Sequence, residues 1–138
     1  MKARAKIRAE DYDALAAFRY AMRKFLRFSK DALAAARLTT EQYEALLAIK
    51  TRSNSTGITV GELSERLQVK HHTAVSLLDK LVARRLVVRQ RASKDRRQVH
   101  IKLMPRGSSV LARMAALHRR EIRYRSSEMI QALRRLQK

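Results

Sequence analysis

Apolar residues recur every three or four positions in several segments of the chain, which is the spacing of amphipathic helices. The first such segment lies near Ile7 to Lys30. A second helix is predicted to begin after Thr39, because Thr39 and Gln42 have the spacing of a capping box. The same device, formed by Thr59 and Glu62, predicts the start of a third, short helix.

The stretch from Gly61 to Leu103 adds a further helix and two strands. A helix near 71–84 has an apolar back, which needs a core, and a polar front formed by His72, Thr73, Ser76, Asp79 and Lys80. Residues 86–91 and 98–103 are typical of strands and flank a basic loop, so they predict a hairpin. In the second strand, Val99, Ile101 and Leu103 are expected to be buried, and the alternating Gln98, His100 and Lys102 exposed. A short strand at 58–60 is a weaker prediction.

A long final helix is predicted after Pro105 and Gly107, with a bend or break near Ser126-Ser127. Its apolar stripe and that of the first helix need more cover than one chain of 138 residues supplies, so a shared dimer core is preferred over packing on the chain's own core. The predicted fold class is mainly α with a small β-hairpin. We expect a single domain, residues 1–138, in which helices 1–37 and 105–138 flank a lobe formed by 38–104.

The net charge of +20, with a pI near 11.5, favours a polyanionic partner over a merely solvated surface. The segment from residue 80 to residue 106 contains ten Lys and Arg residues and a single acidic residue, Asp95. Binding of such a surface to the phosphates of a nucleic acid is favourable because it releases counterions. The polar helix face has the size and chemistry to contact base edges in a major groove, or only phosphate oxygens.

Other functions find little support in the sequence. The chain has no cysteine, no glycine-rich phosphate loop and no paired carboxylates in an apolar setting, so we expect neither an enzyme nor a cofactor. His71 and His72 are adjacent and point about 100° apart on a helix, which disfavours a shared metal ion. There is no signal-peptide pattern and no apolar run of membrane-spanning length, so a soluble, cytoplasmic protein without membrane contact is expected.

Several motifs resemble the MarR family of bacterial winged helix–turn–helix transcription regulators. They are LTTEQYEALLAI, TVGELSERLQV, HHTAVSLLDKLVARRLVVR and KDRRQVHIKLMPRG, which lie between residues 38 and 107, and the resemblance as a whole covers nearly the whole chain. The resemblance implies a homodimer with interlocking N- and C-terminal helices that binds double-stranded DNA. Many relatives are repressors released by small anionic or aromatic effectors, and nothing in this sequence identifies such an effector.

The resemblance also assigns roles to residues. A recognition helix in the major groove would use His71, His72, Thr73, Ser76, Lys80 and Arg84. A wing in the minor groove would use Arg91, Lys94, Asp95, Arg96 and Arg97. In the family pattern, the aspartate at 95 orients the arginine at 97, and a narrow minor groove attracts arginine.

Three positions depart from the family pattern. Arg84-Arg85 replaces the frequent Arg-Gly, so the turn after the recognition helix is expected to differ. Ser76 stands where many members have arginine, which puts base specificity in question. Met104 replaces a threonine before Pro105 and removes a side-chain cap from the final helix.

Three functional hypotheses follow. The first is a dimeric, sequence-specific DNA-binding regulator, most simply a repressor. The second is a non-specific nucleoid-associated or RNA-binding basic protein, since the charge alone requires no base discrimination. The third is a protein-interaction module that uses the terminal helices and does not act on DNA.

Overall fold

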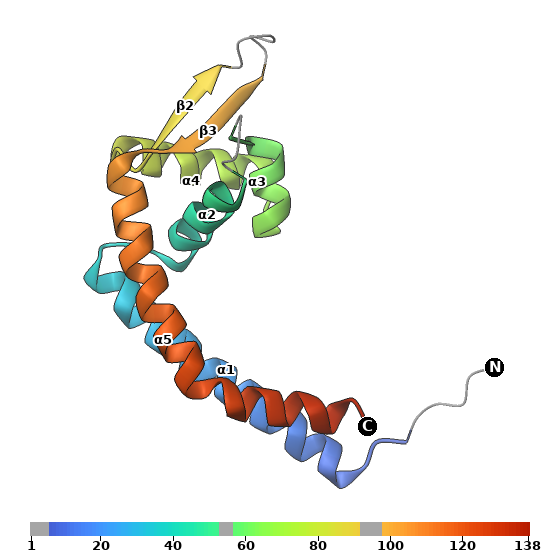
Figure 1. Cartoon of the computed structure of the whole chain (residues 1–138). Helices are drawn as coiled ribbons and strands as arrows, with labels where there is room; N and C mark the ends of the chain where they lie inside the picture. Colours follow the sequence, from blue (N-terminus) through green and yellow to red (C-terminus); the bar gives the residue numbers. More distant parts are fainter. Residues whose placement is uncertain (1–5, 53–56, 92–97) are drawn as a thin grey trace, which may run out of the picture. The chain divides into compact units, whose positions relative to one another are not determined.

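The computed structural model describes residues 6–52, 57–91 and 98–138 (Figure 1). The chain forms two compact units. One unit, the lobe, comprises residues 32–115, and the other, the arm, comprises residues 1–31 and 116–138. Two long helices, α1 (Ala9–Ala35) and α5 (Pro105–Leu136), contribute residues to both units.

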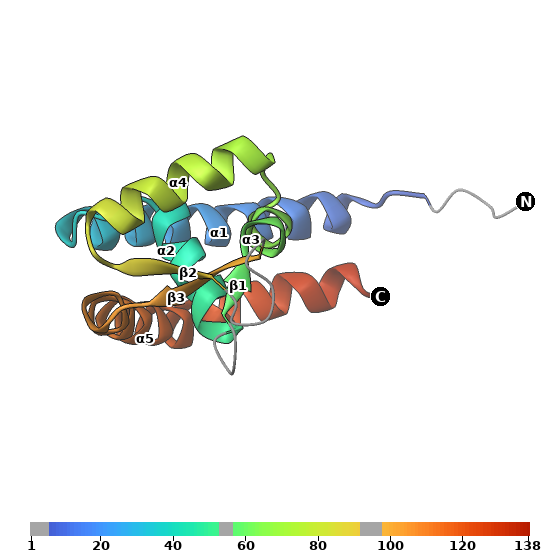
Figure 2. The ribbon, with the colours of Figure 1, turned by 90° about the horizontal axis from the view of Figure 1, so that it is seen from above.

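The lobe contains α2 (Thr40–Thr51), β1 (Ile58–Thr59), α3 (Val60–Leu67), α4 (His71–Ala83), β2 (Val87–Arg91) and β3 (Val99–Leu103). Within the described residues the strands form one antiparallel sheet in the order β1-β3-β2 (Figure 2). The mainly helical fold class with a small hairpin is therefore confirmed. The weakly predicted strand at 58–60 exists as β1 and pairs Ile58 with Ile101.

Both predicted capping boxes are formed. At the start of α2, the Thr39 hydroxyl accepts from the Gln42 amide and the Gln42 side chain accepts from the Thr39 amide, each at 3.1 Å. At the start of α3, the Thr59 hydroxyl accepts from the Glu62 amide at 3.1 Å. These reciprocal bonds satisfy amides that have no partner inside the helix. They define where both helices begin.

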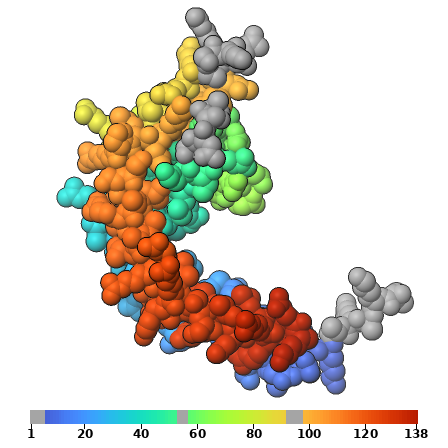
Figure 3. Space-filling model, viewed as in Figure 1, coloured from blue at the N-terminus to red at the C-terminus, as the bar shows by residue number. Residues whose placement is uncertain are grey.

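The lobe has an apolar core to which every one of its elements contributes. Fully buried members include Leu46 and Ile49 of α2, Leu63 of α3, Leu78 of α4 and Ile101 of β3. Burial also raises the pKa of the Tyr43 phenol above its ordinary value of 10.0. Figure 3 shows the surfaces of α2 and α3 in green beside each other, as their packing requires. The core explains why the apolar back of α4 is covered and its polar front is not.

The predicted exposure of His100 is wrong. β3 is the middle strand, with Thr59 opposite His100 on one side and Gln90 on the other, and the His100 side chain is buried. Its Nδ1 atom has no hydrogen-bond partner among the described residues. The alternation of Val99 to Leu103 correctly identified the strand, but a middle strand covers more of its polar face than an edge strand does.

The turn after α4 keeps the conformation that glycine prefers, although arginine occupies it. Arg85 has φ of 57°, and its amide donates to the Val82 carbonyl at 2.9 Å. The Leu86 amide donates to the Leu81 carbonyl at 3.1 Å. These are the two bonds of a Schellman motif. The expectation of a different turn is therefore wrong, because the chain accepts a left-handed arginine there.

The start of α5 lies against the backbone of Leu86. The Met104 amide donates to the Leu86 carbonyl at 3.0 Å, and a Cβ placed on Gly107 would lie 2.0 Å from the same oxygen. Glycine at 107 thus permits a close backbone approach. The helix then continues without interruption to Leu136, so a break near Ser126 is wrong, and the alternative of a bend there remains a prediction. The Ser126 hydroxyl donates to the Arg123 carbonyl at 3.3 Å, a local bond that a helix accommodates.

The arm is built from the N-terminal part of α1 and the C-terminal part of α5, which lie alongside each other (Figure 1). Small residues are buried on both helices, among them Ala14, Ala21 and Ala132. Ser29 Oγ and His118 Nε2 are 2.7 Å apart, and the Phe25 ring meets the His118 ring edge-on at 6.0 Å between centroids. These contacts hold the two helix segments together.

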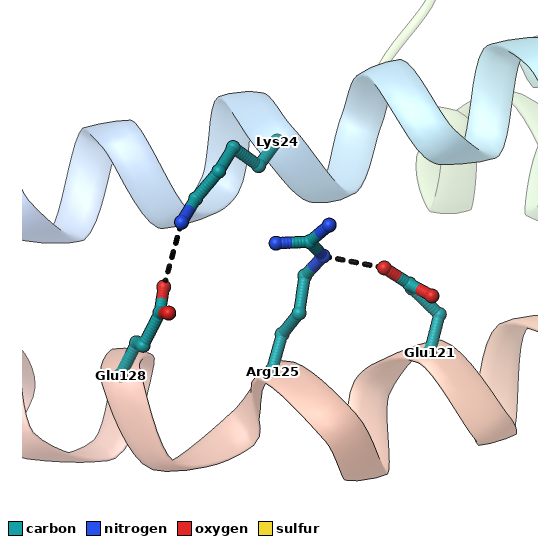
Figure 4. A network of polar contacts seen from close by, with 4 residues as sticks. All are labelled: Lys24, Glu121, Arg125 and Glu128. Atoms are coloured by element: carbon teal, nitrogen blue, oxygen red, sulfur yellow. Dashed lines mark hydrogen bonds and ion pairs between the residues drawn. The ribbon is translucent and has the colours of Figure 1, made fainter.

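Two ion pairs are visible on this arm in Figure 4. Lys24 of α1 and Glu128 of α5 pair across the helices at 3.1 Å, and Arg125 pairs with Glu121 one turn earlier on α5.

The first helix continues to Ala35, five residues beyond its predicted end near Lys30, because the alanines of this segment are strong helix formers. None of the described helices has a long enough apolar stretch to cross a membrane.

Candidate nucleic-acid interface

α3 and α4 pack against each other and are joined by a tight turn. Gln68 ends α3 in a left-handed conformation with φ of 56°. The Val69 amide donates to the Ser64 carbonyl at 3.0 Å, which closes the last turn of α3. Lys70 then precedes the first residue of α4 without a side-chain cap. The result is a helix–turn–helix with α4 as its second helix.

α4 divides into a buried and an exposed face, as its sequence predicted. Ala74, Leu78 and Leu81 are buried in the lobe. The exposed face carries five of the six predicted recognition-helix residues, namely His71, His72, Thr73, Ser76 and Lys80. Arg84 is half-buried and follows the last residue of the helix as its C-cap. Hydroxyl, imidazole and ammonium groups on one face can donate hydrogen bonds to base edges or to phosphates.

A surface hollow of about 380 Å³ runs along this face between the start of α2, the end of α3 and α4. It brings together four predicted site residues, His72, Thr73, Ser76 and Lys80. α2 contributes Glu41 and Glu44, whose carboxylates disfavour a phosphate directly above them. The polar groups of α4 are therefore accessible from a concave surface. The carboxylates of α2 repel a polyanion on their side of the hollow, so a polyanion would approach from the side of α4.

An ion pair joins α4 to the sheet. Arg89 Nη2 of β2 lies 2.5 Å from Asp79 Oδ1 of α4. The Asp79 side chain is 62% exposed, so water screens this pair and its stabilisation is modest. Asp79 is the one carboxylate of α4 and lies next to Lys80, one of the predicted recognition-helix residues, so the pair with Arg89 partly offsets its negative charge there.

The predicted wing is described only in part. Arg91 is the last residue of β2 and is exposed. Lys94, Asp95, Arg96 and Arg97 lie outside the described residues. The roles assigned to them by the family resemblance remain predictions. Among the described residues, no group of three or more His, Asp or Glu side chains could hold a metal ion.

Two further cations lie near the C-terminal end of α4 and were not among the predicted site residues. They are Arg37, which follows α1, and Arg106, in the first turn of α5. Both line a second hollow together with Lys80 and Arg84. Sequence reasoning missed Arg37 because no regular spacing along the chain connects it to α4. The one available signal was its position two residues before Thr39, which begins the capping box of α2.

Comparisons with known proteins agree on one fold. A MarR family model matches residues 38–98. A single-substitution variant of MepR from S. aureus has a TM-score of 0.74 at 20% identity, and 80% of each chain is covered. Another MepR variant, bound to an oligodeoxyribonucleotide, has a TM-score of 0.71 at 21% identity, with 84% of this chain and 82% of that chain covered.

A variant of E. coli MarR complexed with operator DNA has a TM-score of 0.62 at 26% identity, with 72% of this chain and 69% of that chain covered. A comparison with curated proteins finds no match. The family match spans α2 to β2, which includes the helix–turn–helix, and the structural likeness extends over most of the chain. Residues 38–98 thus match the MarR family model, and most of the chain is similar in fold to MepR and MarR.

Proposed function

We propose that this protein is a homodimeric, sequence-specific DNA-binding transcription regulator that acts as a repressor. The observation that carries the proposal is the exposed polar face of α4 on a helix–turn–helix, with Thr73, Ser76 and Lys80 on it. A helix fits the major groove of B-DNA, where each base pair presents a distinct pattern of donors and acceptors. The DNA-bound MepR and MarR structures share this fold and support the same use of it here.

In this proposal α4 enters the major groove and the predicted wing contacts the flanking minor groove. His71, His72, Thr73 and Ser76 lie in the first two turns of α4, where recognition helices contact base edges. Lys80 and Arg84 follow at one-turn spacing and are suited to phosphates. Base specificity should therefore depend on Thr73 and Ser76 more than on the cations.

The second copy is supported by the exposed apolar side chains. Among the described residues, every large apolar side chain that is exposed lies in the arm: Ile7, Tyr12, Leu15, Tyr20, Leu26, Leu117, Ile122, Tyr124, Ile130 and Leu133. A single chain leaves this area uncovered, and such patches mark association surfaces. In a symmetric dimer the same patch of each copy would be buried against the other.

The charge along α1 also favours pairing of two copies. Its first turns contain Glu10, Asp11 and Asp13, whereas Arg19, Arg23 and Arg27 follow. Antiparallel pairing of two identical helices would bring the acidic part of each near the basic part of the other. Two half-sites would then lie about 34–36 Å apart, or at multiples of that distance.

The test is selection of binding sites from random duplexes by the purified protein, followed by affinity measurements at moderate salt. We expect a selected two-fold symmetric sequence to bind at least about a thousandfold more tightly than random duplex. Ser76→Ala should change the preferred bases, with the double change Arg134→Gln and Arg135→Gln, in the arm, as the control. Equal binding to selected and random duplexes would reject the sequence-specific function.

Repression has a separate readout. A promoter that carries the selected site and drives a reporter should lose expression when the protein is supplied and regain it with Ser76→Ala. Increased expression would identify an activator instead. Release by a small anionic or aromatic effector is what the family resemblance implies, and the same reporter can be used to search for one.

The non-specific alternative is favoured by one observation. Half of the net positive charge lies outside the lobe, since each unit contains 16 Lys or Arg and six Asp or Glu. A protein that binds any polyanion through charge alone would use both units. Sequence-independent affinity that falls equally when arm or lobe cations are removed would support this alternative.

A further inference from the structure

We infer that the lobe has a third DNA contact, a phosphate-binding hollow at the C-terminal end of α4 that holds a backbone phosphate of the duplex. The inference rests on the proposed DNA-binding function and adds Arg37 and Arg106, which belong to neither the recognition face nor the wing. The hollow has a volume of about 510 Å³ and is lined by four cations, Arg37, Lys80, Arg84 and Arg106.

The four cations come from segments that are distant in sequence. Arg37 follows α1, Lys80 and Arg84 lie one turn apart at the end of α4, and Arg106 lies at the start of α5. Among the described residues, no acidic side chain lines this hollow. Like charges so close together repel one another, and an anion placed among them removes that cost. The electrostatics therefore favour an anionic ligand.

Arg84 is held in position by neutral oxygens. Its Nη1 atom donates to the Arg37 carbonyl, and Gln42 Oε1 lies 3.4 Å from the same nitrogen. Neither acceptor carries a charge, so the positive charge of Arg84 is oriented but not neutralised. A guanidinium fixed in this way can donate to phosphate oxygens in a planar, two-bond geometry.

Arg37 occupies a backbone position that favours glycine. Its φ is 60°, its amide donates to the Ala34 carbonyl at 2.9 Å, and the Leu38 amide donates to the Leu33 carbonyl. Arginine in this conformation is costlier than glycine by about 1 kcal/mol. Its side chain makes no hydrogen bond or ion pair with another described residue, so the fold gains a polar contact from the Arg37 carbonyl but none from the guanidinium.

The place of the hollow indicates a duplex as the source of the phosphate. Thr39, Gln42 and Lys80 line both this hollow and the one along the recognition face, so the two are adjacent. A helix lying in the major groove has a sugar–phosphate backbone on either side of it. A backbone that borders the groove occupied by α4 would therefore pass the cations at the end of that helix.

The experiment combines two protein variants that each lack one positive charge with DNA in which single phosphates are made uncharged. Arg37→Gln and Arg106→Gln each remove one cation from the hollow, and Arg113→Gln removes one from α5 outside it. We expect the first two to weaken binding about three- to tenfold on selected and random duplexes alike. Each should also reduce the salt slope by about 1, the change for one lost phosphate contact. Arg113→Gln should change both quantities by much less.

A methylphosphonate scan of the selected site locates the phosphate. Replacing one phosphate at a time removes its charge, and wild-type protein should lose affinity at the position that fills the hollow. Arg37→Gln should be insensitive at that position and remain sensitive elsewhere. If no position shows this coupling, or if Arg113→Gln behaves like Arg37→Gln, the hollow is not a phosphate contact, while sequence-specific binding by wild type would still stand.

Inorganic phosphate distinguishes a free anion from a backbone phosphate. At constant ionic strength, 31P line broadening is measured with wild type, Arg37→Gln and Arg106→Gln. Weak broadening that both variants abolish, together with coupling in the scan, supports the duplex as the occupant. Strong phosphate binding without such coupling would overturn the duplex in favour of a free anion. Failure of wild type to bind any duplex would reject the proposed function separately. Circular dichroism should show the same helix content and melting temperature for all variants.

Discussion

Gly107 shows how a single residue fixes the junction between the sheet and α5. A Cβ at this position would lie 2.0 Å from the Leu86 carbonyl oxygen and 2.9 Å from its carbon. Both are backbone atoms and cannot rotate away. Gly107→Ala should therefore lower the free energy of unfolding by about 1–3 kcal/mol, as overpacking does. Denaturation followed by circular dichroism at 222 nm measures it.

Gly61→Ala is the matched control for this change. The nearest atom to a Cβ there is Thr59 Oγ1 at 3.9 Å, an ordinary contact, and Gly61 lies within α3. Alanine is the better helix former, so stability should stay the same or rise by up to about 1 kcal/mol. Equal losses for both alanine variants would contradict the role of the Leu86 contact.

Replacing Arg85 by glycine is predicted to raise stability, whereas the Gly107→Ala change is predicted to lower it. Arg85 adopts φ of 57° after α4, and glycine reaches this conformation without the steric cost of a Cβ. Arg85→Gly should raise the free energy of unfolding by about 0.5–1 kcal/mol, since added freedom in the unfolded chain offsets part of the gain. Thermal unfolding of the two proteins at equal concentration measures the difference.

Arg84→Gly removes the same charge one position earlier and serves as the comparison. Arg84 has φ of −87°, and its side chain is bonded to the Arg37 carbonyl. We expect a loss of stability there. A loss in both variants would show that the charge or the turn sequence matters more than the left-handed conformation.

At the scale of elements, α4 presents one carboxylate, Asp79, near the face that we propose binds DNA. Asp79→Asn removes its charge and frees Arg89 from the ion pair. We expect DNA affinity to rise about two- to fivefold near 0.1 M salt and the gain to fade at higher salt. Stability should fall by less than about 1 kcal/mol, because the pair is exposed.

Glu128→Gln is the control for the Asp79 prediction. It breaks the ion pair with Lys24, which is a similar change in the arm. DNA affinity should rise far less than in Asp79→Asn. An equal rise in the two variants would mean that total charge, and not the position of Asp79, governs binding. Fluorescence anisotropy with a labelled duplex at several salt concentrations measures both.

The helices and strands were the features that the sequence predicted best. Thr39 with Gln42 and Thr59 with Glu62 defined two helix starts, because a capping box is a local interaction between residues three apart. The exposed face of α4 was also foreseen from spacing. The error at His100 arose because burial of this side chain depends on strands on both sides of it, which spacing along the chain does not reveal.

At the scale of the whole molecule, the charge is divided equally between the units even though it is densest along the sequence between 80 and 106. If only the lobe contacts DNA, Arg134→Gln with Arg135→Gln should leave the salt slope unchanged. Arg89→Gln with Arg91→Gln should reduce it by about 1–2. Equal reductions would favour non-specific binding through both units.

Dimer formation is the second whole-molecule prediction. Leu133 is 44% exposed in the arm, and Leu133→Glu should convert the dimer to a monomer because it would bury a carboxylate in an apolar contact. Gln131→Glu adds the same charge at an exposed polar position of α5 and should remain dimeric. Sedimentation equilibrium gives the mass. A monomeric wild type at micromolar concentration would contradict the proposed assembly.

The sequence by itself determined the helix starts, the strands and the polar face of α4, because these follow from interactions between near neighbours and from a regular period. It also carried the motifs of the MarR family. Only the tertiary structure brought Arg37 and Arg106 beside Lys80 and Arg84, since packing in the lobe, and not spacing, joins the ends of α1, α4 and α5. For the same reason, burial of His100 and the close approach at Gly107 became visible only in the folded chain.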